Sequence, residues 1–468
     1  MRAIRYQDHR DDHLQLMQRG KYHEAFAMLQ EMAPMHGDDP VYIADLAEAM
    51  WYMGDEKQVL DLLHILVTRF PDYYRGWLQL GLRMGSYGET EQAVACFRKA
   101  LELKPKSIAA RTELAKHEPF SPNSQQARVL RKYLEDDIAD PVKIEILIAL
   151  ANAEARSGSA VKAFHYWTQM NALRKLDYDT EGLLQMVKEI GRLAPAMPRA
   201  ATDAAMPRFL FITGMPRSGT TITETELAKH PDAHPMGELP TLQIAVQALK
   251  LPAFSGLRRD WIAHLHSIDA AQIAQIRAVF LSQLPRNAPR GKVLITKTPA
   301  DAFSIWAARL IIPELKVLHM ERHPLDVALS NFSTNFGTLR GYHTTLDGIA
   351  DVTRATWQVR DINAGLLGAD MRVQSYRAMV EDQENQLAHC LAFAGLAPER
   401  MQTEADPETL RAVRTASVHQ VRQGVNTKGL EKWRKFERQL APFVSRLGGP
   451  EVITAWEAQD RACDYRLG

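Results

Sequence analysis

The segment FITGMPRSGTT, residues 211–221, has the composition of a phosphate-binding turn. Gly214 and Gly219 have the spacing of the Walker motif GxxxxGK[ST], but Thr220 occupies the lysine position. A helical pattern follows, so backbone N–H groups and the positive end of a helix dipole would converge on an anion. Arg217 could add a forked contact to that anion. An ordinary strand-to-helix turn is the alternative interpretation of this segment taken alone.

A second cationic group and a hydroxyl occur in KVLHMERHPLDVALSNF. Arg322 ends an apolar run, and Ser330 lies eight residues later, about two turns into a helix that should start near Pro324. An anion site that uses both segments would therefore have two arginines and a hydroxyl. A surface ion pair of Arg322 with Glu321 or Asp326 is the alternative.

These segments can meet only if a sheet brings them to one edge. Apolar runs alternate with longer amphipathic segments and lie at 209–213, 292–296, 316–321 and 371–376. This alternation predicts an α/β three-layer domain with a parallel sheet, over residues 208–468. Ligands of such sheets bind at the carboxyl ends of the strands, where the turn and Arg322 lie.

Residues 1–193 have a helical pattern throughout. Gly20, Gly54 and Gly88 lie 34 residues apart, each before a helical stretch, and Pro71 and Pro105 follow two of these stretches at the same spacing. This period resembles the tetratricopeptide repeat and predicts an all-α solenoid of at least three units, with a divergent fourth at 147–167. A plain helical bundle is the alternative. An alanine- and proline-rich linker is expected at 194–207.

Several separated segments resemble one family in their order along the chain. The turn PRSGTT, the arginine that ends a later strand and the serine after it are similar to the sulfotransferases that use 3'-phosphoadenosine 5'-phosphosulfate. The other matching segments are HPDAHPMGEL, LITKTPADAF, VQSYRAMVEDQENQLAHCLAFAGL and VNTKGLEKWRKFERQLAPF. The resemblance covers most of 208–447. It is greatest to the protein-tyrosine type and to bacterial proteins that join tetratricopeptide repeats to a sulfotransferase domain.

The resemblance implies a nucleotide site for the sulfate donor and for its product, 3'-phosphoadenosine 5'-phosphate. Arg322 and Ser330 would hold the 3'-phosphate, and Tyr376 would lie against the adenine or ribose, although a core tyrosine is the alternative. Lys428 lies in a loop, QGVNTKG, that would close over the nucleotide. Related enzymes have a serine near this C-terminal segment that contacts the nucleotide. The corresponding stretch here, GLEKW, has Gly429 and Glu431 instead. The 5'-phosphosulfate would be held by Arg217, Ser218, Gly219, Thr220 and Thr221.

The same resemblance assigns catalytic roles to Glu238, Lys297 and Arg217. Glu238 would be the general base for the acceptor hydroxyl, and a helix-start carboxylate is its alternative. Lys297 would stabilise the leaving bisphosphate, and a surface lysine is its alternative. Arg217 would steady the sulfonate oxygens. Because a sulfuryl group carries less charge than a terminal phosphate, lysine and arginine can replace a metal ion, so we expect no metal.

Composition restricts the other functions. The formal net charge of +1 gives no support for nucleic-acid or membrane binding. The three cysteines are scattered, and no apolar stretch has the length of a signal peptide or membrane span, so a soluble cytoplasmic protein is expected. The acceptor is unidentified by the sequence. The repeats favour a peptide or protein acceptor, and a homo-oligomer is equally compatible. A P-loop kinase and a scaffold with an inactive domain are the remaining alternatives.

Overall fold

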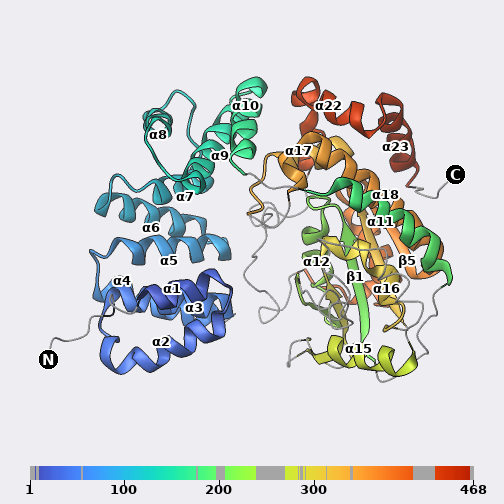
Figure 1. Cartoon of the computed structure of the whole chain (residues 1–468), viewed down its shortest axis with the longest axis horizontal. Coiled ribbons are helices and arrows are strands. Elements are labelled where there is room, and N and C mark those ends of the chain that lie inside the picture. The colour runs from blue at the N-terminus through green and yellow to red at the C-terminus, as the bar shows by residue number, and fades with distance from the viewer. Residues whose placement is uncertain are drawn as a thin grey trace. The chain divides into compact units, whose positions relative to one another are not determined.

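The computed structural model describes residues 6, 10–53, 56–174, 178–196, 206–238, 269–282, 284, 288–289, 291–312, 314–337, 341–403 and 427–463. These residues divide into two compact units, one that ends at Ser159 and one that begins at Ala160 (Figure 1). We call them the repeat unit and the sheet unit. The domain limits expected from the sequence, at 193 and 208, stay predictions.

The repeat unit consists of helices joined by short connections. The second helices of the first three pairs begin at Tyr22, Glu56 and Thr90, 34 residues apart, which confirms the predicted tetratricopeptide-like period. In the turns, Gly20 and Gly88 have φ values of 72° and 82°, a backbone region that suits glycine. The helices are α1 (Arg10–Gln18), α2 (Tyr22–His36), α3 (Pro40–Met53), α4 (Glu56–Arg69), α5 (Tyr74–Tyr87), α6 (Thr90–Leu103), α7 (Ile108–His117), α8 (Gln125–Glu135) and α9 (Asp140–Arg156).

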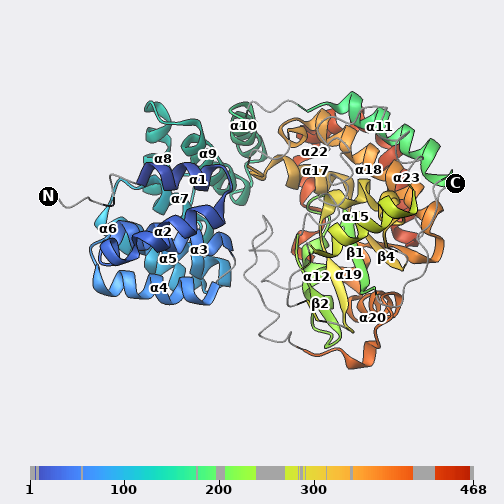
Figure 2. The same cartoon turned by 60° about the horizontal axis from the view of Figure 1, so that its bottom comes forward.

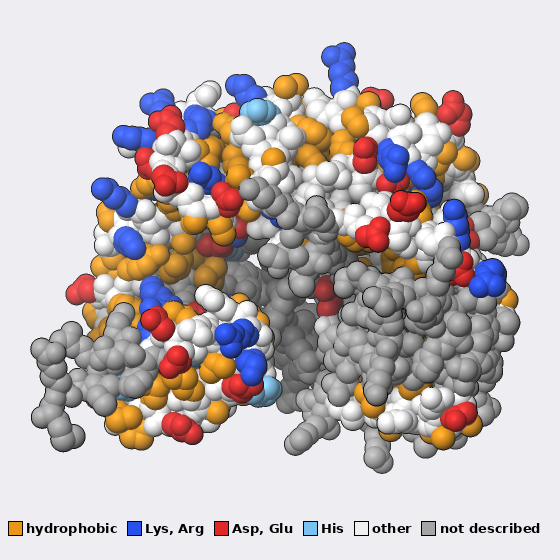
Figure 3. All heavy atoms as spheres, viewed as in Figure 1, with side chains coloured by type: hydrophobic (Ala, Val, Ile, Leu, Met, Phe, Trp, Pro, Cys, Tyr) orange, Lys and Arg blue, Asp and Glu red, His pale blue; other side chains and the backbone are white. Residues whose placement is uncertain are grey.

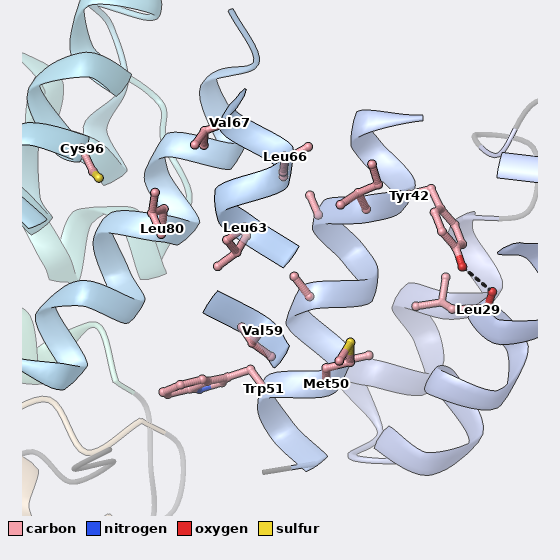
Figure 4. Close-up of a cluster of buried hydrophobic side chains, with 14 of the residues drawn as sticks. Leu29, Tyr42, Met50, Trp51, Val59, Leu63, Leu66, Val67, Leu80 and Cys96 are labelled. Carbon is pink, nitrogen blue, oxygen red and sulfur yellow. Dashed lines mark hydrogen bonds between the residues drawn. The ribbon is translucent and has the colours of Figure 1, made fainter. Parts of the chain in front are cut away.

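Apolar side chains from successive helices form one continuous core in the repeat unit (Figure 4). A Cβ at Gly81 would lie 2.7 Å from the Phe97 ring, so α5 and α6 pack this closely only with glycine there. The pair α7 and α8 was not predicted, although these helices begin 34 and 35 residues after α5 and α6, because Pro122 stands where the earlier turns have glycine. On the face of the repeat unit in Figure 3, acidic and basic side chains are interspersed.

The sheet unit contains five parallel strands in the order β2-β3-β1-β4-β5, which confirms the predicted α/β fold. All four predicted strands are present, and the three-residue strand β2 lies within a segment that was not predicted as a strand. The strands are β1 (Arg208–Gly214), β2 (Ala233–Pro235), β3 (Val293–Thr296), β4 (Leu315–Glu321) and β5 (Met371–Ser375).

Helices cover both faces of this sheet. Leu210 and Ile212 of β1 share a core with α12 and α20, whereas Phe209, on the other face, contacts Phe280 of α15 at 5.4 Å between ring centroids. Figure 2 shows α18 and α20 on opposite sides of the sheet. The helices of this unit are α10 (Ala160–Ala172), α11 (Thr180–Leu193), α12 (Thr220–Leu227), α15 (Ala270–Ser282), α16 (Ile305–Ala308), α17 (Pro324–Phe332), α18 (Leu346–Leu367), α19 (Tyr376–Glu381), α20 (Gln383–Phe393), α22 (Glu437–Leu447) and α23 (Pro450–Ala462).

Short 3-10 helices complete the sheet unit. They are η2 (Ala194–Ala196), η3 (Pro299–Phe303), η4 (Tyr342–Thr344), η5 (Gly368–Asp370), η6 (Pro398–Arg400), η7 (Thr427–Gly429) and η8 (Lys432–Phe436). Within the described ranges of the chain, no helix combines the length and the apolar character that a membrane span requires.

Candidate active site

The glycine-rich turn connects β1 to α12 at the carboxyl edge of the sheet. Gly214 has a φ of 136°, and a Cβ there would lie 2.6 Å from the Met320 carbonyl oxygen of β4. Gly219 has a φ of 108°, and a Cβ there would lie 2.4 Å from the Tyr376 ring. Both glycines are therefore required by conformation and by close contact. Asn331 Nδ2 donates to the Pro216 carbonyl at 2.8 Å and anchors the turn to α17.

Arg217, Arg322 and Ser330, which the sequence placed in two phosphate subsites, lie together. Arg217 Nε donates to Ser330 Oγ at 2.8 Å. Arg322 Nη1 donates to the Arg217 carbonyl at 2.8 Å, and Nη2 donates to the Gly429 carbonyl at 2.6 Å. The Arg322 guanidinium also lies over the Tyr376 ring, 4.7 Å from its centroid. The turn, β4 and the segment around Gly429 thus converge on one site.

The alternative ion pairs of Arg322 are not formed, because both carboxylates have other partners. Glu321 accepts from Arg360 Nη1 of α18 at 2.8 Å. Asp326 accepts from the backbone N–H groups of Glu431 and Trp433 at 2.8 and 3.0 Å. Asp326 thereby holds the segment before η8 against α17. The Arg322 guanidinium remains directed at the carbonyls and the tyrosine ring of the site.

The site concentrates positive charge. Burial, together with the neighbouring Arg322 charge, lowers the pKa of Arg217 to about 10. Burial and the charges of Arg322 and Arg217 also lower the pKa of Lys432. The sequence interpretation did not include Lys432 in the site. Lys432 is only four residues from the predicted Lys428, and a basic residue in this tail was the available signal. A cluster of three cations favours binding of an anion.

Two polar atoms at the cluster have no partner among the described residues. Ser218 Oγ is buried and lacks a hydrogen bond, as does Arg322 Nε. A buried polar group without a partner costs free energy, and an anion with several oxygens would accept from both. Ser218 is a predicted phosphosulfate ligand, so this observation agrees with its expected role. Thr220 is buried and Thr221 half-buried at the start of α12.

Lys297 and Glu238, the two predicted catalytic residues that lie 59 positions apart in the sequence, form an ion pair. Lys297 Nζ donates to Glu238 Oε1 at 2.6 Å; the lysine side chain is 1% exposed and the glutamate side chain 46%. Lys297 is therefore not a surface lysine. Its backbone N–H donates to the Gly237 carbonyl at 3.0 Å, and the Gly237 N–H donates to Glu224 Oε1 at 2.8 Å. The turn that carries Glu238 is thus held by β3 and α12.

Lys297 reaches the site because of strand register. Thr296 of β3 pairs with Phe211 of β1, so Lys297 leaves the sheet beside the strand that delivers the turn. Tyr376 lies at the first position of α19 and not in β5, because Ser375 Oγ accepts from the Ala378 N–H at 3.0 Å and caps a helix there. Its ring still packs against Gly219, as described above.

Some predicted elements lie outside the described residues. They are the Lys428 side chain and residues 423–426 of the same loop. The sequence also predicts that the helical, leucine- and alanine-rich segment 240–290 lines the acceptor side, and most of that segment lies outside the described residues as well. The histidines near the motifs have protein partners: His319 Nδ1 bonds Thr213 Oγ1 at 3.0 Å, and His323 Nε2 bonds Glu457 Oε1 at 3.0 Å. Within the described part of the chain, no cluster of His, Cys, Asp and Glu could hold a metal ion.

Comparison with known proteins identifies the family of the sheet unit. Residues 207–400 match the model of the sulfotransferase family. These residues form a sulfotransferase-family domain. The match to this sulfotransferase domain includes Arg217, Glu238, Lys297 and Arg322 but ends before Lys432. The cationic segment around η8 therefore lies outside the region that matches the family model, although the sequence resemblance includes it.

Two curated proteins and a solved structure are similar to parts of this chain. An uncharacterized protein of Aquifex aeolicus strain VF5 is 26% identical over 422 residues, 88% of this chain but 55% of that protein, so the chain spans about half of that relative's length. A putative protein-tyrosine sulfotransferase of Caenorhabditis briggsae is 24% identical over 267 residues, 52% of this chain and 89% of that protein. The solved sulfotransferase of Alicyclobacillus acidocaldarius has 18% identity and a TM-score of 0.30, with 54% of this chain and 100% of that chain covered.

Proposed function

We propose that the sulfotransferase domain transfers a sulfuryl group from 3'-phosphoadenosine 5'-phosphosulfate to an acceptor hydroxyl. The observation that carries this proposal is the contact of Arg217 with Ser330 and Arg322, with Lys432 near both arginines, at the glycine-rich turn of a sulfotransferase-family domain. A nucleotide with phosphate groups at both ends of its ribose would bring negative charge to each part of this cluster. The nucleotide also supplies the activated sulfuryl group.

The cluster divides into two subsites in this proposal. The turn, with Ser218 and Arg217, binds the 5'-phosphosulfate through backbone N–H groups, the buried hydroxyl and the guanidinium. Arg322, Ser330 and Lys432 bind the 3'-phosphate. The Arg217–Ser330 hydrogen bond of 2.8 Å joins the two subsites. Tyr376 lies between the turn and Arg322, where its ring would contact the sugar or base.

Glu238 then acts on the acceptor hydroxyl, which forms the new bond to sulfur, and Lys297 acts on the oxygen that leaves sulfur. In the pair described here, the Lys297 ammonium holds the Glu238 carboxylate at 2.6 Å. An anionic leaving oxygen beside the turn competes for the same ammonium, which frees the carboxylate to accept the proton of the acceptor hydroxyl. Lys297 then stabilises the departing oxygen, and Arg217 stabilises the sulfonate oxygens during in-line transfer.

We propose that the acceptor is a side-chain hydroxyl of a peptide, with tyrosine as the leading candidate. Two observations support it: the description of the Caenorhabditis relative as a putative protein-tyrosine sulfotransferase, and the tetratricopeptide-like repeat unit in the same chain. Solenoids of this kind present extended surfaces to peptides. Transfer of labelled sulfate to tyrosine peptides, with matched phenylalanine peptides as controls, tests the acceptor class separately from the donor.

The donor is tested by calorimetric titration of the full chain with 3'-phosphoadenosine 5'-phosphate and with ADP, in EDTA. We expect tight binding of the bisphosphate and little binding of ADP. Arg322→Ala should weaken binding of the bisphosphate far more than binding of ADP. Arg438 is an exposed arginine of α22, and Arg438→Ala should change neither affinity. Equal affinity of the wild-type chain for both nucleotides would refute the proposed donor, and a requirement for magnesium would favour a kinase.

A further inference from the structure

Helix α10 packs on the end of α17 in the sheet unit. The sequence pattern places the first part of α10, up to residue 167, in a divergent repeat, yet the Phe164 ring stacks on Phe332 with 4.7 Å between centroids and 16° between planes. Asn171 Nδ2, also from α10, donates to the Phe332 carbonyl at 2.9 Å in a buried position. This carbonyl belongs to the last turn of α17, where no further helical N–H is available, so Asn171 caps the helix from outside.

The end of α17 is close to the predicted 3'-phosphate subsite. Phe332 lies two residues after Ser330, whose hydroxyl accepts from Arg217 Nε. The next residue, Asn331, anchors the glycine-rich turn through Pro216. A shift of the last turn of α17 would therefore move the Ser330 hydroxyl and the anchor of the turn together, because one short helix carries both.

The same face of α10 holds a second element of the site. Trp167 packs on Phe436 with 5.4 Å between ring centroids and an interplanar angle of 45°. Phe436 ends η8, and Lys432 begins it. Trp167 is 4% exposed and Phe436 is 5% exposed, so this contact is part of a closed core. Helix α10 thus contacts both the helix that carries Ser330 and the segment that carries Lys432.

We infer that α10 positions the 3'-phosphate subsite, with Trp167 and Asn171 as positioning residues for Lys432 and Ser330. The inference rests on the proposed function, because it names the subsite of that same nucleotide. Trp167 and Asn171 touch no nucleotide group themselves and act through Phe436 and Phe332. Binding of a nucleotide without a 3'-phosphate should therefore be nearly independent of both residues.

The test compares 3'-phosphoadenosine 5'-phosphate with adenosine 5'-phosphate, the same nucleotide without its 3'-phosphate, on full-length variants. Trp167→Ala and Asn171→Ala should each raise the Kd of the bisphosphate about tenfold, the equivalent of one weakened charge-assisted hydrogen bond. The Kd of adenosine 5'-phosphate should stay within about twofold. Trp167→Phe keeps an aromatic ring against Phe436 and should retain the wild-type preference.

Two controls separate positioning from general destabilisation. Lys162→Ala changes an exposed residue of α10 and should alter neither affinity. Ile362→Ala removes a contact of α18 with α11, near Gly191, and should lower the melting temperature without changing the ratio of the two affinities. If Trp167→Ala does not fold, Asn171→Ala gives the answer, because it keeps the aromatic core.

The outcomes distinguish the two proposals. A wild-type chain that binds both nucleotides equally would refute the proposed donor whatever α10 does. A wild-type chain that prefers the bisphosphate, with the same preference in Trp167→Ala and Asn171→Ala, would overturn the positioning role of α10. Equal weakening of both nucleotides with a lowered melting temperature would also overturn it, since α10 would then support only the fold.

Discussion

Replacement of Arg217 by methionine should stabilise the ligand-free protein while it removes nucleotide binding. Burial and the Arg322 charge lower the pKa of Arg217 from its ordinary value to about 10. Each pKa unit corresponds to about 1.4 kcal/mol, so the protonated side chain costs the folded state roughly 3 kcal/mol. The lost hydrogen bond to Ser330 offsets about 1 kcal/mol of this gain. Methionine keeps an unbranched stem and leaves a net stabilisation of about 2 kcal/mol.

The sign of this effect follows from linkage. Below a pH of about 10, Arg217 is protonated in both the folded and the unfolded chain, so the whole cost is present. The cost disappears only as the pH rises above about 10, where the folded state loses this proton before the unfolded state does. The gain of Arg217→Met should therefore be the same at every pH near neutrality.

Differential scanning calorimetry of the full chain measures this prediction. The transition of the sheet unit should rise by roughly 4 °C in Arg217→Met. Arg438→Met, which changes an exposed arginine, should leave stability within about 0.5 kcal/mol. Added 3'-phosphoadenosine 5'-phosphate should raise the melting temperature of the wild type and not that of Arg217→Met. A melting temperature several degrees lower in Arg217→Met would refute the claim that the buried Arg217 charge destabilises the ligand-free protein.

Three further changes test the remaining parts of the site. Glu238→Ala should lower turnover by on the order of 100- to 10,000-fold and leave nucleotide affinity nearly intact, because Lys297 remains; unchanged turnover would remove Glu238 from the role of base. Gly219→Ala should lower the unfolding free energy by about 2 kcal/mol, since a Cβ would meet the Tyr376 ring at 2.4 Å; an unchanged melting temperature would contradict the close packing. Bisphosphate affinity should fall as the pH rises through the lowered pKa of Lys432, where that cation is lost, and titrations of Lys432→Met across the same pH range should lack this step.

Local patterns determined much of the fold. The 34-residue period predicted the starts of α2, α4 and α6, since a repeat places the same small residue at each turn. Four strands were predicted from short apolar runs because both faces of a parallel sheet are buried. Strand β2 and the pair α7–α8 were missed, because a three-residue strand has too few residues for a pattern and because Pro122 replaces the glycine that marks the earlier turns.

The candidate site was predictable only where its residues lie in short motifs. Gly214 and Gly219 were found from a local spacing, and the eight residues between Arg322 and Ser330 correspond to two helical turns in the observed α17. These features depend on neighbours in sequence. The roles assigned to Glu238 and Lys297 came from resemblance and remain predictions, although the structure brings the two side chains to 2.6 Å.

Tertiary structure alone decided the contacts between distant segments. The strand register sets Lys297 beside the turn, Asp326 brings Lys432 to the two arginines, and Trp167 packs α10 against η8. None of these relations follows from propensity or periodicity, because each depends on which surfaces become buried against one another. By itself the sequence determined the glycine-rich turn and the two architectures; packing determined which charges meet around it.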